Sequence, residues 1–447
     1  MHLLQLQLCT LLIGVWLCQA AKLHNKMTAD ELARLLGSRS LDEIPDYDLV
    51  SPFQVDEHGS FHSNDLSTIH LRTRRSDYHL VKDVPAHFKV PAFGDVHHLA
   101  VSPNNELLSP GFLLQVHLEN GKIDTHYEYT HSQYVGTVRG DEDSHVAISN
   151  HGGNLMGVII TANMTLMLQP LPDHHSIGSV ANPDNHTHIV YRRQANDALT
   201  TRPYGRARGC DVNESIPAED YQEAQRGEYL PGGKLQTLAS GLDQQYVVEA
   251  IVVGDKELLR KWNYNVNNVK YYIITLMNIA SSMYNRDKLG YDVRLVLTRI
   301  AIFQSENAQR DQRLYISQNS KTTLESFCDW QARTKPEANS RLAYDHAFLF
   351  TGYGLCFGRN EDCWELGRAW VQGMCRDKYA CSVNAEKGMQ LGFVFAHELG
   401  HNLGMSHDGA NGRCRAENGY VMKSSTGLAQ NIYLWSSCSK NYLLSYL

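Results

Sequence analysis

The segment HELGHNLGMSHD, from His397 to Asp408, predicts a zinc site near the end of the chain. His397 and His401 are four residues apart, so on a helix their side chains project from one face, one turn apart. Gly404 can adopt the left-handed conformation that ends a helix, and the reversed chain then delivers His407 as a third ligand. Three protein ligands leave a fourth zinc position open for water, which is typical of a catalytic rather than a structural site.

The residue after the first histidine supplies a carboxylate for this chemistry. Glu398 stands next to His397, close enough to take a proton from a water molecule on the zinc. A serine nucleophile is not needed, and the sequence contains no Gly-x-Ser-x-Gly motif. The alternative interpretation is a helix whose histidines only make local hydrogen bonds.

These motifs resemble the reprolysin (adamalysin-type) branch of the metzincin zinc proteases. Asp408 follows the third histidine, and Met422 in GYVM matches the Met-turn beneath the metal, although a methionine there would also suit an ordinary core. The chain is similar in particular to the ADAMTS family of secreted proteases, strongly over 246–447 and more weakly before it. The segments that carry this similarity are SFCDWQ (326–331), VQGMC (371–375) and WSSCSKNYL (435–443).

The apolar patterns of the second half predict an α/β domain. They indicate strands over 246–255, 293–303 and 345–352 and a helix over 265–290 that stops at Gly290. The resemblance implies a metzincin catalytic domain over 244–447, with a twisted, mostly parallel sheet, an active-site helix that binds zinc, and its C-terminal end missing. It also implies that 367–375 forms an antiparallel edge strand, which can pair with an extended peptide substrate.

The first half has the pattern of a mostly β pro-domain, assigned to 21–243. Residues 22–75 are polar and weakly periodic, whereas alternating segments predict strands over 112–122, 145–149, 155–160 and 165–171. In the family, a cysteine pair usually occupies the positions matched here by Ser132 and His151. Because both cysteines are replaced, the resemblance implies that this disulfide is absent.

Composition and the N-terminus indicate export. The net charge of −7 and the pI of about 6.3 give no basic surface for nucleic acid. Residues 3–17 are apolar and are followed by Cys-Gln-Ala, so we predict a signal peptide over 1–20. A membrane anchor would need about twenty apolar residues. We therefore expect a protein secreted to the extracellular space or matrix, without a transmembrane anchor.

The cysteines fit an oxidising compartment. Seven of the eight cysteines after the predicted signal peptide lie beyond residue 327, which is typical of a disulfide-bonded secreted domain. The resemblance implies that Cys375 has its partner beyond Leu447 and is unpaired in this chain. It implies three other pairs: Cys328 with Cys381, Cys356 with Cys363, and Cys414 with Cys438. Glycosylation sequons occur at Asn163, Asn185 and Asn213.

Residues 172–243 are rich in Pro, Gly, Asn, Asp and Arg and predict a linker with a latency device. Cys210 lies there in GRARGCDV, where the flanking arginines would lower the pKa of its thiol. Its thiolate in the open zinc position would act as a cysteine switch; the alternative is a disulfide to the odd cysteine of the catalytic half. RTRR (72–75) fits a proprotein convertase site or a solvated charge cluster, and cutting there would leave Cys210 attached.

Two acidic residues complete the predicted sites. Glu249 and Asp345 match positions that bind a structural Ca²⁺ in the family, although acidic residues near strand ends are also common on a plain surface. Together these features predict a secreted zinc metalloendopeptidase, made as a latent zymogen, that cleaves extracellular matrix or other secreted proteins. The alternative is a non-catalytic secreted binding or decoy form, or an inactive truncated zymogen. The peptide-accepting edge strand argues against a zinc enzyme for small molecules.

Overall fold

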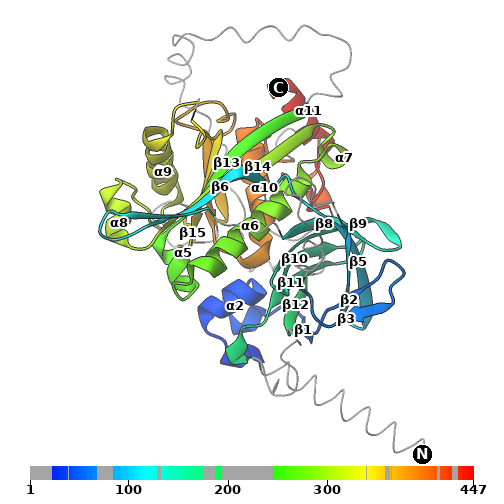
Figure 1. The fold of residues 1–447 in the computed structure, drawn as a ribbon. Helices are drawn as coiled ribbons and strands as arrows, with labels where there is room; N and C mark the ends of the chain where they lie inside the picture. Colours follow the sequence, from blue (N-terminus) through cyan, green and yellow to red (C-terminus); the bar gives the residue numbers. More distant parts are fainter. Residues whose placement is uncertain are drawn as a thin grey trace, which may run out of the picture. The chain divides into compact units, whose positions relative to one another are not determined.

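The computed structural model describes residues 23–38, 40–67, 84–127, 132–175, 187–193, 245–338, 340–357, 363, 365–409, 413–424 and 431–447. The chain divides into two compact units, each with its own sheet (Figure 1). The first unit is Met1–Pro103, Ser132–Gln194 and Lys387–Met389. The second is Asn104–His131, Ala195–Glu386 and Gln390–Leu447.

The first unit is built on a ten-stranded sheet in which every neighbouring pair is antiparallel. The mostly β pro-domain that the sequence predicts is therefore confirmed, and the strands predicted at 145–149, 155–160 and 165–171 lie in β9, β10 and β11. In spatial order the strands are β1 (Tyr47–Val50), β12 (His188–Arg193), β11 (Thr165–Pro170), β10 (Asn154–Ile160), β9 (Asp141–His151), β8 (Gln133–Val138), β5 (Asp95–Pro103), β4 (Ala86–Ala92), β2 (Phe53–Val55) and β3 (Phe61–Ser63).

Alternation of buried and partly buried residues places the core of this unit on one face of the sheet. In β4 the side chains of Ala86, Phe88, Val90 and Ala92 are buried and the residues between them are not. A strand presents every second side chain to the same face, so this period of two identifies the core side directly. The same cluster includes Leu99, Ile148, Leu155, Ile159, Leu166 and Val190.

Two segments, one within the first unit and one that begins in it, are more regular than their composition predicts. Residues 22–75 contain α2 (Ala29–Leu36), η1 (His24–Lys26) and η2 (Leu41–Glu43), as well as β1 to β3. The predicted linker 172–243 contains η3 (Asp173–His175) and β12, which pairs with both β1 and β11. The linker prediction is wrong at β12. The apolar run of this strand, from His188 to Tyr191, is short, and the polar residues on both sides of it gave the whole segment the composition of a linker.

Ser132 and His151, the positions for which the resemblance implies an absent disulfide, lie side by side in the first unit. Ser132 Oγ is 3.0 Å from His151 Nδ1, a hydrogen-bonding distance. A polar contact therefore joins the residue before β8 to the end of β9.

The second unit has a seven-stranded, mostly parallel sheet, which confirms the predicted α/β class. The five strands from β17 to β6 run parallel, and β16 and β7 pair antiparallel at the two edges. In spatial order the strands are β16 (Gly367–Ala369), β17 (Cys381–Ala385), β15 (His346–Thr351), β13 (Gln245–Gly254), β14 (Asp292–Phe303), β6 (Leu108–His117) and β7 (Ile123–His126).

Helices cover both faces of this sheet. On one face α9 packs against β13, β15 and β17 through Phe327 and Trp330, which share a cluster with Ile251 and Val253. On the other face Phe395 of α10 stacks on Phe348 with ring centroids 5.0 Å apart. The helices of this unit are α5 (Lys256–Lys261), α6 (Val266–Met283), α7 (Arg286–Leu289), α8 (Glu306–Asp311), α9 (Ser320–Thr334), α10 (Leu391–Asn402) and α11 (Ser437–Tyr446), with η5 (Ala416–Asn418). Gly388 and Met389 of η4 (Gly388–Gln390) belong to the first unit.

The strand predicted at 112–122 belongs to the second unit, although the sequence places it in the pro-region. As β6 it pairs in parallel with β14, with Leu114 opposite Ile300 and Val116 opposite Ile302. The ring of His117 stacks on Phe303 with centroids 4.4 Å apart. The pro-region therefore contributes two strands, β6 and β7, to the sheet on which the helix of the zinc motif, α10, packs.

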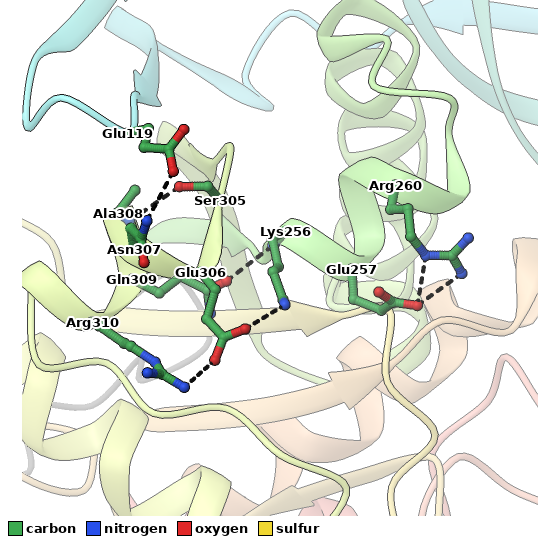
Figure 2. A network of polar contacts seen from close by, with 10 residues as sticks. All are labelled: Glu119, Lys256, Glu257, Arg260, Ser305, Glu306, Asn307, Ala308, Gln309 and Arg310. Atoms are coloured by element: carbon green, nitrogen blue, oxygen red, sulfur yellow. Dashed lines mark hydrogen bonds and ion pairs between the residues drawn. The ribbon is translucent and has the colours of Figure 1, made fainter.

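Polar contacts hold the turn of this hairpin near the ends of β13 and β14 (Figure 2). Asn307 Nδ2 donates to Glu119 Oε1 at 2.8 Å, and Lys256 Nζ pairs with Glu306 Oε2 at 2.8 Å. Arg310 joins the same carboxylate. Because the charged groups of these pairs are partly or largely exposed to solvent, the pairs add little to stability, and the bond from Asn307 to Glu119 is the one that links the hairpin to α8.

Candidate metal centre

The zinc motif forms the C-terminal half of α10 and a tight reversal after it. The amide of Gly404 donates to the carbonyl of His401, and the amide of Met405 donates to that of Gly400, both at 2.9 Å. This is the Schellman pattern, and it requires a left-handed residue at Gly404, whose φ is +86°. The predicted helix end is therefore present, and the chain turns back toward His407.

The structure brings the three predicted histidines together. His407 Nε2 lies 3.1 Å from Nε2 of both His397 and His401. His397 Nδ1 lies 2.7 Å from the carbonyl of Val421, and His401 Nδ1 lies 2.8 Å from that of Met405. An Nδ1–H that donates to a carbonyl leaves Nε2 deprotonated and directed at a common point, as a zinc ligand requires. The donor set and its spacing fit Zn²⁺.

Burial keeps these imidazoles neutral. Desolvation, together with the neighbouring His407, lowers the pKa of His397 to about 3. Desolvation and the two other histidines lower the pKa of His401 well below its usual range. At neutral pH both rings therefore present lone pairs, and metal binding needs no prior loss of a proton.

Glu398 is fully buried at the same site, and its carboxylate lies against β16. A Cβ placed on Gly367 would come within 2.5 Å of Glu398 Oε1 and 2.8 Å of its carboxyl carbon. Only a residue without a side chain leaves room for the carboxylate in this position. The sequence did not indicate a role for Gly367, because the contact joins residues 31 positions apart.

We expect Gly367→Ala to lower kcat/KM for peptide cleavage by about 100-fold, because a displacement of about 1 Å in a catalytic group has effects of that size. The measurement compares the variants after removal of the pro-region, with zinc content determined in parallel. Gly254→Ala is the control within the catalytic half, since a Cβ at Gly254 would come no closer than 3.3 Å to another atom, the side-chain Cδ2 of Leu258. Full activity of Gly367→Ala would contradict the assigned packing.

Three buried side chains support the zinc helix from below. Met422 is fully buried, and its Sδ would lie 2.8 Å from a Cβ at Gly400, so it packs against the turn between His397 and His401. Tyr284 Oη donates to the carbonyl of Ala396 at 2.6 Å, and Trp435 Nε1 donates to that of Met283 at 2.7 Å. The sequence singled out Met422; the tyrosine and tryptophan have no local signature.

Asp408 closes the loop that carries the third histidine. Its amide donates to the carbonyl of Met422 at 2.8 Å, and its Oδ1 accepts from Ser436 Oγ at 2.6 Å. Desolvation raises the pKa of Asp408, opposed by that hydrogen bond. The residue after His407 therefore ties the loop to the Met422 segment.

The predicted edge strand at 367–375 is present but shorter. Only β16 pairs with β17, antiparallel and at the edge of the sheet. Beyond it the amides of Gln372 and Met374 donate to the carbonyls of His401 and Asn402, at 2.9 and 3.1 Å. These contacts join the segment after β16 to the C-terminal end of α10 and draw the chain away from the sheet.

The structure pairs six of the predicted cysteines and places two acidic residues together. The disulfides are Cys328–Cys381, Cys356–Cys363 and Cys414–Cys438, and Cys375 is a free, exposed thiol. Asp345 Oδ2 accepts a hydrogen bond from the amide of Glu249 at 2.8 Å. The groups of three or more metal-ligating side chains found among the described residues do not include this pair.

Several predicted sites lie outside the described residues: the signal peptide, RTRR (72–75), Cys210, Asn185 and Asn213. Asn163 is described and exposed, between β10 and β11. Within the described ranges no helix is long and apolar enough to cross a membrane.

Comparison with known sequences identifies the class. The sequence model of the reprolysin (M12B) family of zinc metalloproteases matches residues 245–447, and that of the reprolysin family propeptide matches residues 48–139. The two matches together cover more than half of the chain. The chain belongs to the reprolysin family.

Curated relatives narrow the similarity to the ADAMTS family, as the motifs indicate. The chain is 31% identical over 445 residues to A disintegrin and metalloproteinase with thrombospondin motifs 18 of Mus musculus, covering 90% of this chain and 35% of that protein. It is 28% identical over 439 residues to A disintegrin and metalloproteinase with thrombospondin motifs 16 of Homo sapiens, covering 91% and 35%. The chain thus spans about a third of the length of these relatives.

Proposed function

We propose that this protein is a secreted zinc endopeptidase made as a latent zymogen. The observation that carries the proposal is the convergence of three imidazole nitrogens beside the buried carboxylate of Glu398. Family membership makes protein substrates the natural class. Extracellular matrix or other secreted proteins are the substrates that the predicted signal peptide favours.

His397, His401 and His407 would hold the zinc, which when bound supplies a Lewis acid that polarises a carbonyl and lowers the pKa of water to about 7. Glu398 accepts the proton of the attacking water at its carboxylate and passes it to the leaving amine. Gly367 leaves the space in which that carboxylate stays in place. No acyl-enzyme is formed, so no serine or cysteine nucleophile takes part.

Substrate would pair with the edge strand. β16 is the last strand of the sheet, and main-chain hydrogen bonds to such an edge accept many sequences. Because β16 also packs against Glu398, a peptide paired with it would have its backbone near the general base. This supports an endopeptidase rather than an enzyme for small molecules.

The test is zinc content together with cleavage of a fluorogenic peptide, measured before and after proteolytic trimming past Cys210. We expect activity only after trimming, its loss with a chelator, and its return with added Zn²⁺. Trimmed protein that holds zinc in the three-histidine site but cleaves nothing would contradict the proposal and favour a binding or decoy form.

Latency would rest on Cys210 as a zinc ligand in the zymogen. We expect Cys210→Ala to raise peptidase activity of the untrimmed protein at least about 10-fold, because the fourth zinc position is then open. The control is Cys375→Ala, which removes the free thiol of the described residues. If both variants raised the activity of the untrimmed protein equally, a disulfide between Cys210 and Cys375 would explain latency instead of a zinc ligand. If neither variant raised the activity, both explanations would be wrong.

The remaining predicted features belong to the same proposal. A proprotein convertase would cut after Arg75, and another protease would release the segment with Cys210. Glycans at Asn163, Asn185 and Asn213 would be carried by the pro-region, where the exposed position of Asn163 makes it accessible. A structural Ca²⁺ at Glu249 and Asp345 would need further ligands beyond this pair.

A further inference from the structure

A second group of metal-ligating side chains lies in the first unit, far in sequence from the zinc motif. Glu31 lies on α2, and His174 and His175 lie on η3. Glu31 Oε1 is 2.7 Å from His174 Nε2 and 3.3 Å from His175 Nε2. One ligand atom from each of the three residues lies within 4.8 Å of the others.

These distances are close to those of the three-histidine site in the same structure, where His407 Nε2 is 3.1 Å from Nε2 of each of the other two histidines. Tetrahedral Zn²⁺ with bonds of about 2.0–2.1 Å places its ligand atoms about 3.3 Å apart. The pair at 3.3 Å already has this separation, and the pair at 2.7 Å, a hydrogen bond in the structure, would lengthen by about 0.6 Å around the ion. Two imidazoles and one carboxylate form a donor set that Zn²⁺ accepts in catalytic sites.

The carboxylate of Glu31 is held in place by the start of α2. Its Oε2 accepts from the amide of Thr28 at 2.8 Å and from the hydroxyl of Thr28 at 3.0 Å. Thr28 Oγ1 in turn accepts from the amide of Glu31, which completes a capping box. One carboxylate oxygen is therefore used by the helix cap, and Oε1 is left facing the two histidines.

His175 is the second, independent indication of a ligand. Its side chain is only 6% exposed, and within the described part of the chain its Nε2 makes no hydrogen bond. Although Nε2 lies 3.3 Å from Glu31 Oε1, the contact does not meet hydrogen-bond geometry. A buried ring nitrogen without such a bond is costly unless something else occupies its lone pair. A metal ion between the ring and the carboxylate would do so.

His174 leaves the site open on one side. Its side chain is 58% exposed, whereas that of Glu31 is 10% exposed. An ion held by these three residues would have buried ligands behind it and room for water in front, and it could enter from solvent.

We propose that Glu31, His174 and His175 form a second binding site for a divalent transition-metal ion, with Zn²⁺ as the preferred ion. Imidazole and carboxylate ligands in tetrahedral spacing favour Zn²⁺ over Ca²⁺ or Mg²⁺, which require oxygen ligands. The site joins residues 143 positions apart, so the ion would fasten α2 to the segment after β11. Its binding energy would stabilise the first unit.

The rival explanation is an ion pair in which protonated histidines share the charge of Glu31. The two accounts differ in zinc stoichiometry. The full chain carrying Glu398→Gln, which limits self-cleavage, is equilibrated at pH 7.4 with a chromophoric zinc chelator. We expect two zinc ions per chain, one at each site.

His174→Ala and Glu31→Gln are then added to this background. Glutamine keeps the capping box, and the exposed His174 can be removed without disturbing the core. We expect each variant to lose one zinc, with affinity at the second site lower by at least about 100-fold. His58→Ala is the matched control and should retain both ions, because His58 forms an exposed pair with Glu57 at 3.4 Å.

One zinc in the parent protein, with its loss on His397→Ala, would overturn the proposal in favour of the ion pair. Two zinc ions that persist in His174→Ala and Glu31→Gln would overturn it by placing the second ion elsewhere. Circular dichroism of each variant distinguishes loss of a ligand from loss of fold.

Discussion

Glu398→Gln should lower kcat for peptide cleavage by about 10²–10⁴-fold while zinc stays bound, because general acid–base catalysis contributes rate enhancements of that size. The amide is nearly the same size as the carboxylate, so it fits the space that Gly367 leaves. It cannot accept the proton of the attacking water. KM should change little, since Glu398 acts on water and the leaving group rather than on substrate binding.

The measurement is kcat and KM for a fluorogenic peptide after removal of the pro-region, with zinc determined on the same samples. Glu386→Gln is the matched control: Glu386 is also buried in the second unit, and its Oε1 accepts from Tyr272 Oη at 3.1 Å. A glutamine there can still accept that hydrogen bond, so activity should persist. Turnover by Glu398→Gln close to that of the unaltered protein would remove Glu398 from the mechanism.

The zinc site could be predicted from sequence because its geometry is local. His397 and His401 share a face by helical spacing, and Gly404 ends the helix through two hydrogen bonds within five residues. Only the placement of His407 depends on the loop that follows, and Asp408 anchors that loop to Met422. Such short-range rules hold whatever the rest of the chain does.

The packing around the site could not be predicted in the same way. Gly367 meets Glu398, and Tyr284 meets the carbonyl of Ala396, only because the sheet and two helices have assembled. No period or motif in the sequence records such contacts. The second metal-ligating group could not be predicted either. The spacing of Thr28 and Glu31 fits a capping box, but nothing in the sequence indicates that His174 and His175 lie beside Glu31.

Strand identity was predicted better than strand partnership. The β-branched runs at 246–255 and 293–303 form β13 and β14, as their composition indicates. The run at 112–122 was also predicted as a strand, but β6 joins β14, whose residues lie about 180 positions later. β6 lies between β14 and β7, and the alternation of its residues does not by itself specify which sheet the strand joins.

The largest expected effect on stability comes from a residue away from the zinc. Asp255 is fully buried where β13 ends, and three groups donate to its carboxylate. The amides of Leu258 and Gly352 donate to Oδ1 at 2.7 and 3.0 Å, and Thr351 Oγ1 donates to Oδ2 at 2.5 Å. Burial raises the pKa of Asp255, while these hydrogen bonds oppose the rise.

Asp255→Ala should therefore reduce the free energy of unfolding by about 3–5 kcal/mol. It removes the N-cap of α5, the bond to the amide of Leu258, which costs about 1 kcal/mol. It also leaves the buried donors of Thr351 and Gly352 unsatisfied at about 1–3 kcal/mol each, partly recovered by relaxation. Asp255→Asn retains an acceptor oxygen and should lose roughly half as much. The measurement is the midpoint of urea unfolding, monitored with a spectroscopic probe in the second unit. The slope of the unfolding free energy against urea concentration should be the same in all variants.

Ser305→Ala gives the scale for a helix cap without this buried network. Ser305 caps α8 through one bond to the amide of Ala308 at 3.2 Å, so its removal should cost about 1 kcal/mol. If Asp255→Ala cost no more than Ser305→Ala, the links from Asp255 to the end of β15 would contribute nothing to stability. A loss of unfolding free energy several times larger would show that the carboxylate of Asp255 joins the C-terminal ends of β13 and β15 to the start of α5.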